Sequence, residues 1–152
     1  MSEQRQRSEW LTGPVLVVGA GLLGTSVGLA CRRSGLEVLL SDLAVEHVRT
    51  ASGMGAGRAL ADGDAPQLVV VAVPPDHLGA AVAAALEAHP EAVVTDVGSV
   101  KTGPWRAVAD SPSCDRYVGG HPMAGSERSG PLAASASLFD GRPWAITPHR
   151  DS

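Results

Sequence analysis

Short runs of consecutive apolar residues recur along the chain, and most of them end in glycine, proline or a polar residue. Continuous apolar runs, unlike alternating ones, are typical of strands that are buried on both faces of a sheet. The last two runs are shorter than the others. The pattern predicts strands at residues 14–19, 36–42, 67–75, 91–99, 116–120 and 143–147.

The segments between these runs have helical spacing or helix-forming composition. Leu23, Val27 and Cys31 recur on one face of a helix that Gly35 can end. An alanine-rich segment follows Asp76, which is a plausible N-cap. Residues 53–66 carry no clear pattern. The predicted helices span residues 22–35, 44–53, 76–89 and 100–111.

Strands that alternate with helices predict an α/β fold, a single Rossmann-like domain with a doubly wound and mostly parallel sheet. Ligands of such sheets bind beyond the carboxyl ends of the strands, at the point where the strand order reverses. The residues that follow each predicted strand are therefore the candidate functional residues.

The segment GAGLLG matches G-x-G-x-x-G between a predicted strand and a predicted helix. In this motif the first glycine permits a tight turn, the second admits a pyrophosphate, and the third lets helix and strand pack closely. The helix N-terminus attracts the phosphates. The predicted cofactor-binding residues of this loop are Gly19, Ala20, Gly21, Leu22, Leu23 and Gly24.

Asp42 ends the second predicted strand, 18 residues after the last glycine of the motif, where a carboxylate accepts hydrogen bonds from the adenine ribose. Because its charge repels a 2′-phosphate, the predicted cofactor is NAD rather than NADP. The alternative is a glycine-rich turn that serves packing, with Asp42 capping the next helix.

Two prolines follow the third predicted strand in the segment AVPPD. Val73 and Pro74 are predicted to form a rigid apolar ledge beside the ribose of the cofactor. A simple strand terminator before a capped helix is an equally good interpretation, and the two are compatible.

Ser99 lies at the carboxyl tip of the fourth predicted strand, in the segment TDVGSVK. Its hydroxyl can donate and accept hydrogen bonds and so orient an imidazole or a substrate hydroxyl. The segment is not a G-x-S-x-G nucleophile elbow. The alternative is a serine N-cap followed by a solvated Lys101.

His121 follows the predicted strand RYVGG, and Pro122 restricts it to an extended backbone. The glycine pair before it is interpreted as room for a ligand close to the main chain. A histidine is most often a surface or satisfied core residue. The position of His121 at the binding edge, near Ser99 if the fold is right, favours a catalytic role.

The composition of the chain limits the classes of molecule that we expect it to bind. Hydrophobic residues make up 44% of the 152-residue chain and charged residues 18%, as in globular proteins. The net charge of −4 gives no reason to expect nucleic acid or an anionic membrane as partner. No apolar run has the length of a signal peptide core or a membrane span. Cys31 and Cys114 form no disulfide or metal pattern, which favours reduced thiols and a cytoplasmic protein.

Several segments together resemble the nucleotide-binding domain of the prephenate/arogenate dehydrogenase family, over about residues 14 to 148. HPMAGSE and SVK are the specific part of this resemblance, because the glycine motif is shared by many dehydrogenases. The segments that carry it are VVGAGLLGTSVGLA, DVGSVK, GGHPMAGSERSG and LFDGRPWAITP.

The resemblance implies NAD-dependent oxidative decarboxylation of a small-molecule substrate, prephenate or arogenate, in tyrosine biosynthesis. His121 would accept the proton of the ring 4-hydroxyl, and Ser99 would position that histidine and hydroxyl. Gly125, Ser126 and Glu127 would lie near the substrate. No metal is implied.

The family also has a second, helical domain that closes the active site, forms the dimer and supplies cations for the substrate carboxylates. We therefore expect a flexible tail at 1–13, the dinucleotide-binding domain at 14–148, and at 149–152 the start of a link to that domain. A homodimer is expected only where the helical domain is present.

Two other functions remain open from the sequence. One is a non-catalytic NAD-binding module that senses the cofactor or docks a partner. The other is a different dehydrogenase on the same fold.

Overall fold

The computed structural model describes residues 10–124 and 129–147. Within them one sheet runs in the order β3-β2-β1-β4-β5-β6-β7. All neighbouring strands are parallel except β6 and β7, which are antiparallel. The strands are β1 Val15–Val18, β2 Val38–Ser41, β3 Arg58–Ala59, β4 Leu68–Val71, β5 Val93–Asp96, β6 Tyr117–Pro122 and β7 Trp144–Thr147.

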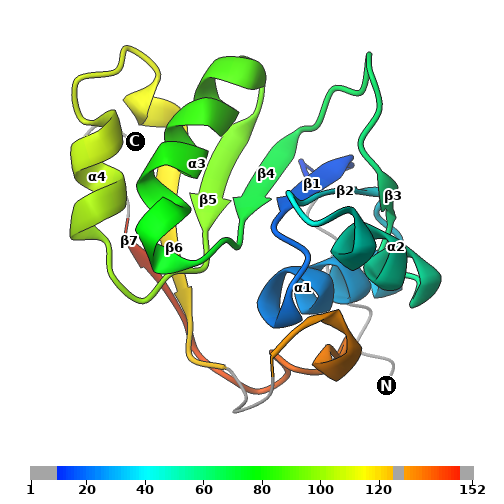
Figure 1. Cartoon of the computed structure of the whole chain (residues 1–152). Coiled ribbons are helices and arrows are strands. Elements are labelled where there is room, and N and C mark those ends of the chain that lie inside the picture. Colours follow the sequence, from blue (N-terminus) through cyan, green and yellow to red (C-terminus); the bar gives the residue numbers. More distant parts are fainter. Residues whose placement is uncertain (1–9, 125–128, 148–152) are drawn as a thin grey trace.

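Helices cover both faces of this sheet, with α1 and α2 on one side and α3 and α4 on the other (Figure 1). The order of elements confirms the predicted single Rossmann-like α/β domain, and the previously unassigned residues 53–66 contain β3. The helices are α1 Leu22–Arg33, α2 Val45–Gly53, α3 Pro75–Ala88 and α4 Thr102–Val108, with short 3-10 turns η1 Cys114–Arg116 and η2 Pro131–Ala133.

Strand β1 shows why its sequence is apolar at consecutive positions. Leu16 packs into the cluster under α3 and α4, whereas Val15 and Val17 pack into the cluster under α1 and α2. All three are at most 1% exposed. Alternate side chains of a strand point to opposite faces, so a strand between two helical layers needs an apolar residue at every position.

The start of α3 differs from the prediction. Pro74 occupies the N-cap position and Pro75 the first helical position, so Asp76 lies in the first turn and is not the cap. Proline fits the first helical position because its φ is already helical and its missing N–H would have no intrahelical acceptor there. The charge of Asp76 is still favourable, because it faces the positive end of the helix dipole.

Part of the predicted N-terminal tail is tied to the domain. The backbone N–H groups of Thr12 and Gly13 donate to the Gln67 side-chain oxygen at 2.9 and 3.0 Å, and the Gln67 amide donates to the Trp10 carbonyl. Residues 1–9 and 148–152 lie outside the described residues.

Both cysteines are free thiols, as the sequence predicts. Cys31 packs against the cluster under α1 and α2, and burial raises the pKa of its thiol to about 11. It is therefore protonated and poorly nucleophilic near neutral pH. In the described residues, no helix has the length and apolar character needed to cross a membrane.

Candidate functional site

The strand order reverses between β1 and β4, and the chain segments that leave these two strands meet there. The Ala72 N–H donates to the Val18 carbonyl at 2.7 Å. Because β2, β1, β4 and β5 are parallel, the segments after all four strands lie along the same edge of the sheet. This is the edge at which ligands of such sheets bind.

At two positions of the glycine loop, neighbouring backbone atoms leave no space for a Cβ atom, so only glycine fits. Gly19 has φ +101°, and a Cβ there would lie 2.5 Å from the Ala72 carbonyl oxygen. A Cβ on Gly24 would lie 1.7 Å from the Gly19 carbonyl oxygen. The tight turn predicted for Gly19 and the close approach of helix and strand predicted for Gly24 are both present.

Gly21, in contrast, is not required by any contact with the described residues. Apart from its chain neighbours, no atom of the described residues lies within 4 Å of the position that its Cβ would take. It occupies the N-cap position of α1, with no side-chain cap bond and no acidic residue in the first turn. The N–H groups of that turn, at Leu22, Leu23 and Gly24, have no intrahelical acceptor because of helix geometry. An open glycine beside an uncompensated helix N-terminus fits the pyrophosphate of a dinucleotide.

Asp42 links the glycine loop to the segment that precedes α2. One carboxylate oxygen accepts the Ala20 N–H at 2.7 Å, and the other accepts the Ala44 N–H at 2.7 Å. The side chain is 16% exposed, and the His47 Nδ1 atom lies 3.7 Å from Oδ2. Asp42 thus holds the turn before α2, but Ala44 occupies the N-cap position of that helix, so the alternative interpretation of Asp42 as the cap is wrong. Each carboxylate oxygen can also accept a second hydrogen bond, so the carboxylate remains available to ribose hydroxyls.

Val73 and Pro74 lie where the chain leaves β4. Val73 packs partly against the cluster under α3, and Pro74 is exposed. The same two residues therefore end the strand, begin α3 and border the switch point. The ledge and the terminator interpretations are both compatible with this geometry.

Asp96, at the end of β5, is a buried carboxylate with four donors. Oδ1 accepts the Tyr117 hydroxyl at 2.7 Å and the Gly120 N–H at 3.2 Å. Oδ2 accepts the Gly98 N–H at 2.9 Å and the Lys101 ammonium. Asp96 is 0% exposed. One side chain therefore joins the loop after β5 to strand β6.

His121 lies within β6, where it pairs with Ala145 of β7, and not beyond the strand as the sequence predicted. The antiparallel pairing extends β6 by two residues past the predicted end. His121 is half-buried. Its neighbour Gly120 donates to Asp96.

The glycine pair before His121 serves packing and not a ligand, which corrects the prediction. A Cβ on Gly120 would lie 2.5 Å from the Asp96 carbonyl oxygen and 2.9 Å from the Trp144 indole nitrogen. A Cβ on Gly119 would lie 3.1 Å from the Lys101 side chain. The room that these glycines provide is taken by neighbouring protein atoms.

Ser99 is exposed in the loop after β5, and no hydrogen bond joins it to His121 among the described residues. It is not the N-cap of α4 either, because Lys101 holds that position. Lys101 is not solvated, since its side chain is only 16% exposed and binds Asp96. Ser99 and His121 are instead connected through Asp96. The Gly98 N–H, next to Ser99, and the Gly120 N–H, next to His121, both donate to the Asp96 carboxylate.

Sequence reasoning missed the residues that build this connection, Asp96 and Tyr117. Burial, followed by the hydrogen bond to Asp96, holds the pKa of Tyr117 well above its usual range, so its hydroxyl stays a donor. The ring of Trp105 packs edge-on against it at 5.1 Å between ring centres. An aspartate at the end of a mostly apolar strand was the available signal. The predicted substrate residues Gly125, Ser126 and Glu127 lie outside the described residues.

We expect Asp96→Asn to lower the free energy of unfolding by about 3 kcal/mol, because an amide cannot satisfy Lys101 and three further donors in a buried site. Urea unfolding followed by circular dichroism measures this change. Asp110→Asn is the matched control: Asp110 is exposed, so its loss should stay within about 0.5 kcal/mol. Equal effects of the two substitutions would contradict the structural role of Asp96.

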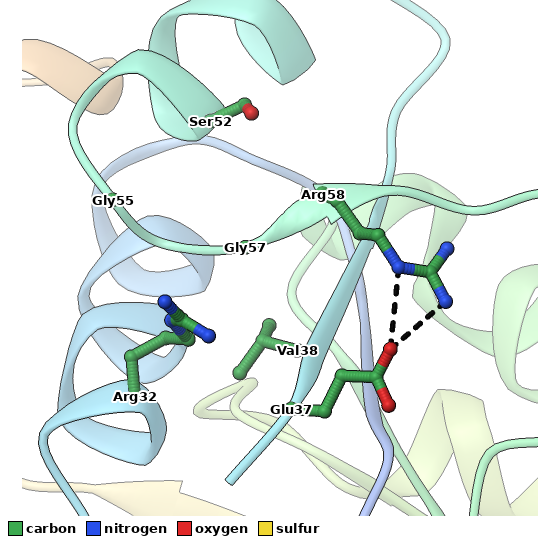
Figure 2. Close-up of a pocket in the computed structure, with 7 residues that line it drawn as sticks. All are labelled: Arg32, Glu37, Val38, Ser52, Gly55, Gly57 and Arg58. Carbon is green, nitrogen blue, oxygen red and sulfur yellow. Dashed lines mark hydrogen bonds and ion pairs between the residues drawn. The ribbon is translucent and has the colours of Figure 1, made fainter. Parts of the chain in front are cut away.

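A cavity of about 280 Å³ lies at the other end of the sheet (Figure 2). Arg58 donates to Glu37 at 2.9 Å and to Asp64 at 2.8 Å, and Arg32 lies across the cavity from the Arg58–Glu37 pair. The hydrogen bond from Arg58, with that from the Ala61 N–H, lowers the pKa of Asp64 to about 2. Arg58 and Glu37 are exposed, Asp64 is partly buried, and these three charges pair with one another. The cavity borders the start of β2, so it is separate from the glycine loop.

The residues that the structure describes contain no group of three or more His, Cys, Asp or Glu side chains arranged to hold a metal ion. The chemistry that the described part of this edge offers is therefore that of an anion-binding loop, carboxylates and a half-buried imidazole.

The chain matches the family model of the prephenate dehydrogenase nucleotide-binding domain over residues 27–152. It is 42% identical over 135 residues to the probable prephenate dehydrogenase NovF of Streptomyces niveus, which covers 88% of this chain and 37% of that protein. It is 33% identical over 150 residues to the prephenate dehydrogenase of Bacillus subtilis (strain 168), covering 88% of this chain and 39% of that protein. The chain thus spans well under half the length of these two relatives.

Solved structures agree with the sequence comparisons. The crystal structure of prephenate dehydrogenase from A. aeolicus in complex with hydroxyphenyl propionate and NAD+ superposes with a TM-score of 0.78 at 26% identity. The match covers 91% of this chain and 51% of that one. Fold, family model and relatives lead to one assignment: the chain belongs to the prephenate dehydrogenase family and corresponds to its nucleotide-binding domain.

Proposed function

We propose that this chain is the NAD-binding domain of a prephenate or arogenate dehydrogenase and contributes one side of its active site. The observation that carries the proposal is the pairing of an open Gly21 at the start of α1 with a carboxylate, Asp42, beside the same loop. The relatives named for this activity support it, as does the A. aeolicus structure that contains NAD+.

The cofactor would lie across the switch point. The first turn of α1 would bind the pyrophosphate, and Asp42 would accept the hydroxyls of the adenine ribose. Val73 and Pro74 would border the remainder of the dinucleotide. When bound, NAD supplies the acceptor for a hydride from C4 of the substrate ring.

Loss of that hydride turns the C4 hydroxyl into a ketone only if the hydroxyl proton also leaves. We assign this proton to the imidazole of His121, since a neutral histidine is a suitable base near neutral pH. Ser99 would orient the hydroxyl, and Gly125, Ser126 and Glu127 would line the substrate. Release of CO₂ then makes the ring aromatic, which drives the reaction forward.

Asp96 supports this arrangement without touching the substrate. Its two oxygens hold the loop that carries Ser99 and the strand that carries His121. The relative position of these two side chains therefore depends on a buried group with four donors, which is a rigid support.

The remaining features of the proposal concern partners and location. We propose a cytoplasmic enzyme acting on a small molecule, with no nucleic acid or membrane as partner. Cations for the substrate carboxylates and the dimer contact would come from a helical domain that follows this one in the family.

NAD is expected to bind this chain at least about tenfold more tightly than NADP, because a 2′-phosphate would lie beside the Asp42 carboxylate. Calorimetric titration with both nucleotides measures the ratio. Asp42→Ser should bring the ratio closer to one. Asp42→Asn is the matched variant, since it removes the charge but keeps an acceptor for a backbone N–H. A preference for NADP in the unmodified chain would refute the assignment of Asp42.

A further inference from the structure

A histidine stands beside the carboxylate that is proposed to select the cofactor. His47 lies in the first turn of α2, and its Nδ1 atom is 3.7 Å from Asp42 Oδ2. The imidazole is 46% exposed and the Asp42 side chain 16%. The separation is too long for a hydrogen bond but short enough for the two charges to interact directly.

Among residues 10–124 and 129–147, the other charged groups near His47 are few. On α2 itself they are Glu46 and Arg49. The glycine loop, strand β2 and turn η2, which surround this end of α2, carry no titratable side chain. Strand β3 also packs on α2, but its Arg58 is bound to Glu37 and Asp64. Within the part of the chain that the structure describes, Asp42 is therefore the group whose charge His47 can most directly offset.

We propose that His47 is a specificity-determining residue that makes the discrimination between NAD and NADP depend on pH. This inference rests on the proposed binding of a dinucleotide at Asp42. NADP carries a phosphate in place of the 2′-hydroxyl that would donate to Asp42, so the phosphate must lie close to this carboxylate.

The charge of His47 determines how unfavourable it is to place the 2′-phosphate beside the Asp42 carboxylate. At high pH the imidazole is neutral, and the full charge of Asp42 repels the phosphate. At low pH the imidazolium offsets Asp42 and adds a cation within reach of the phosphate. A basic residue near this position is the usual means by which such folds accept a 2′-phosphate.

The experiment is calorimetric titration of the 152-residue chain with NAD and with NADP at about pH 5.5 and pH 8, on either side of the usual histidine range. We expect the ratio of the NADP to the NAD dissociation constant to be about threefold to fivefold smaller at the lower pH, the range of a partly exposed ion pair. Thermal melting at both values verifies that the protein is folded.

His47→Gln is the decisive comparison, because glutamine keeps polar atoms but cannot become charged in this range. The 2′-phosphate itself titrates near pH 6, and this contribution is the same for both proteins. The proposal predicts that the ratio of the NADP to the NAD dissociation constant changes less with pH in His47→Gln than in the unmodified chain, with only the contribution of the phosphate left. It also predicts that this ratio is smaller in His47→Arg than in the unmodified chain at both pH values.

Two results would overturn the inference while the proposed function stands: a ratio that does not change with pH, or one that changes equally in His47→Gln. If neither nucleotide binds at either pH although the protein is folded, the proposed function itself fails, and the inference with it.

Discussion

Replacing His121 with asparagine is expected to lower kcat by about 10²–10⁴-fold and to leave NAD affinity unchanged. The reason is the proposed role of the imidazole as acceptor of the ring hydroxyl proton. The acidic limb of the pH–rate profile should vanish with it, because asparagine cannot take up a proton. Ser99→Ala should cost less, since it removes an orienting hydroxyl and keeps the base.

The rate is to be measured on a chain that continues into the C-terminal part of the Bacillus subtilis relative, with prephenate and with arogenate. The 152-residue chain alone is the reference, and we expect it to show little or no turnover. If the extended chain binds NAD but turns over neither acid, an NAD-binding module or another dehydrogenase becomes the better interpretation.

A structural role of His121 would produce a different pattern. The residue pairs with Ala145 across β6 and β7, so a histidine needed only for packing would lower the melting temperature, the NAD affinity and the rate together. Thermal melting beside the kinetics separates the two cases. A variant with native melting temperature and unchanged kcat would remove His121 from the mechanism.

Substituting alanine at Gly24 is expected to destabilise the fold by more than about 4 kcal/mol, at the extreme of single substitutions. The added Cβ would lie 1.7 Å from the Gly19 carbonyl oxygen. That oxygen belongs to the backbone of the loop, so it can move only if α1 separates from β1. Chemical denaturation measures the loss, and NAD binding should disappear with the folded state.

Gly21→Ala is the matched variant in the same loop. Apart from its chain neighbours, no described atom lies within 4 Å of its Cβ position, and its φ of −83° suits alanine, so the stability should stay within about 1 kcal/mol of the unmodified chain. NAD affinity should nevertheless fall by roughly tenfold to a hundredfold, because the methyl group occupies the path of the pyrophosphate. Unchanged NAD affinity in Gly21→Ala would show that the cofactor does not approach this glycine.

Local signals in the sequence were sufficient for the fold. A strand buried on both faces must be apolar at every position, and β1, β2 and β4 are found within the predicted ranges for this reason. The roles of Gly19 and Gly24 also followed from the motif, because the turn and the close packing involve residues near each other in the chain or on adjoining strands.

The candidate site was only partly predictable, because its supporting contacts join distant segments. Asp96 binds Gly98 and Lys101 in its own loop, but also Tyr117 and Gly120 on the neighbouring strand. Whether Lys101 is solvated or buried, and whether Gly120 faces a ligand or the Asp96 backbone, depends on the pairing of β5 with β6. No pattern along the chain contains that information.

The sequence by itself determined the glycine loop, the carboxylate after β2 and every strand except β3, since each follows from periodicity or from a motif of fixed spacing. The tertiary structure decided the rest. It placed His121 inside a strand, through pairing with β7, and left Ser99 exposed. It also brought Tyr117 and Gly120 to Asp96. These outcomes depend on strand order and register, because hydrogen bonds and charges act over a few ångströms in space, whatever the separation along the chain.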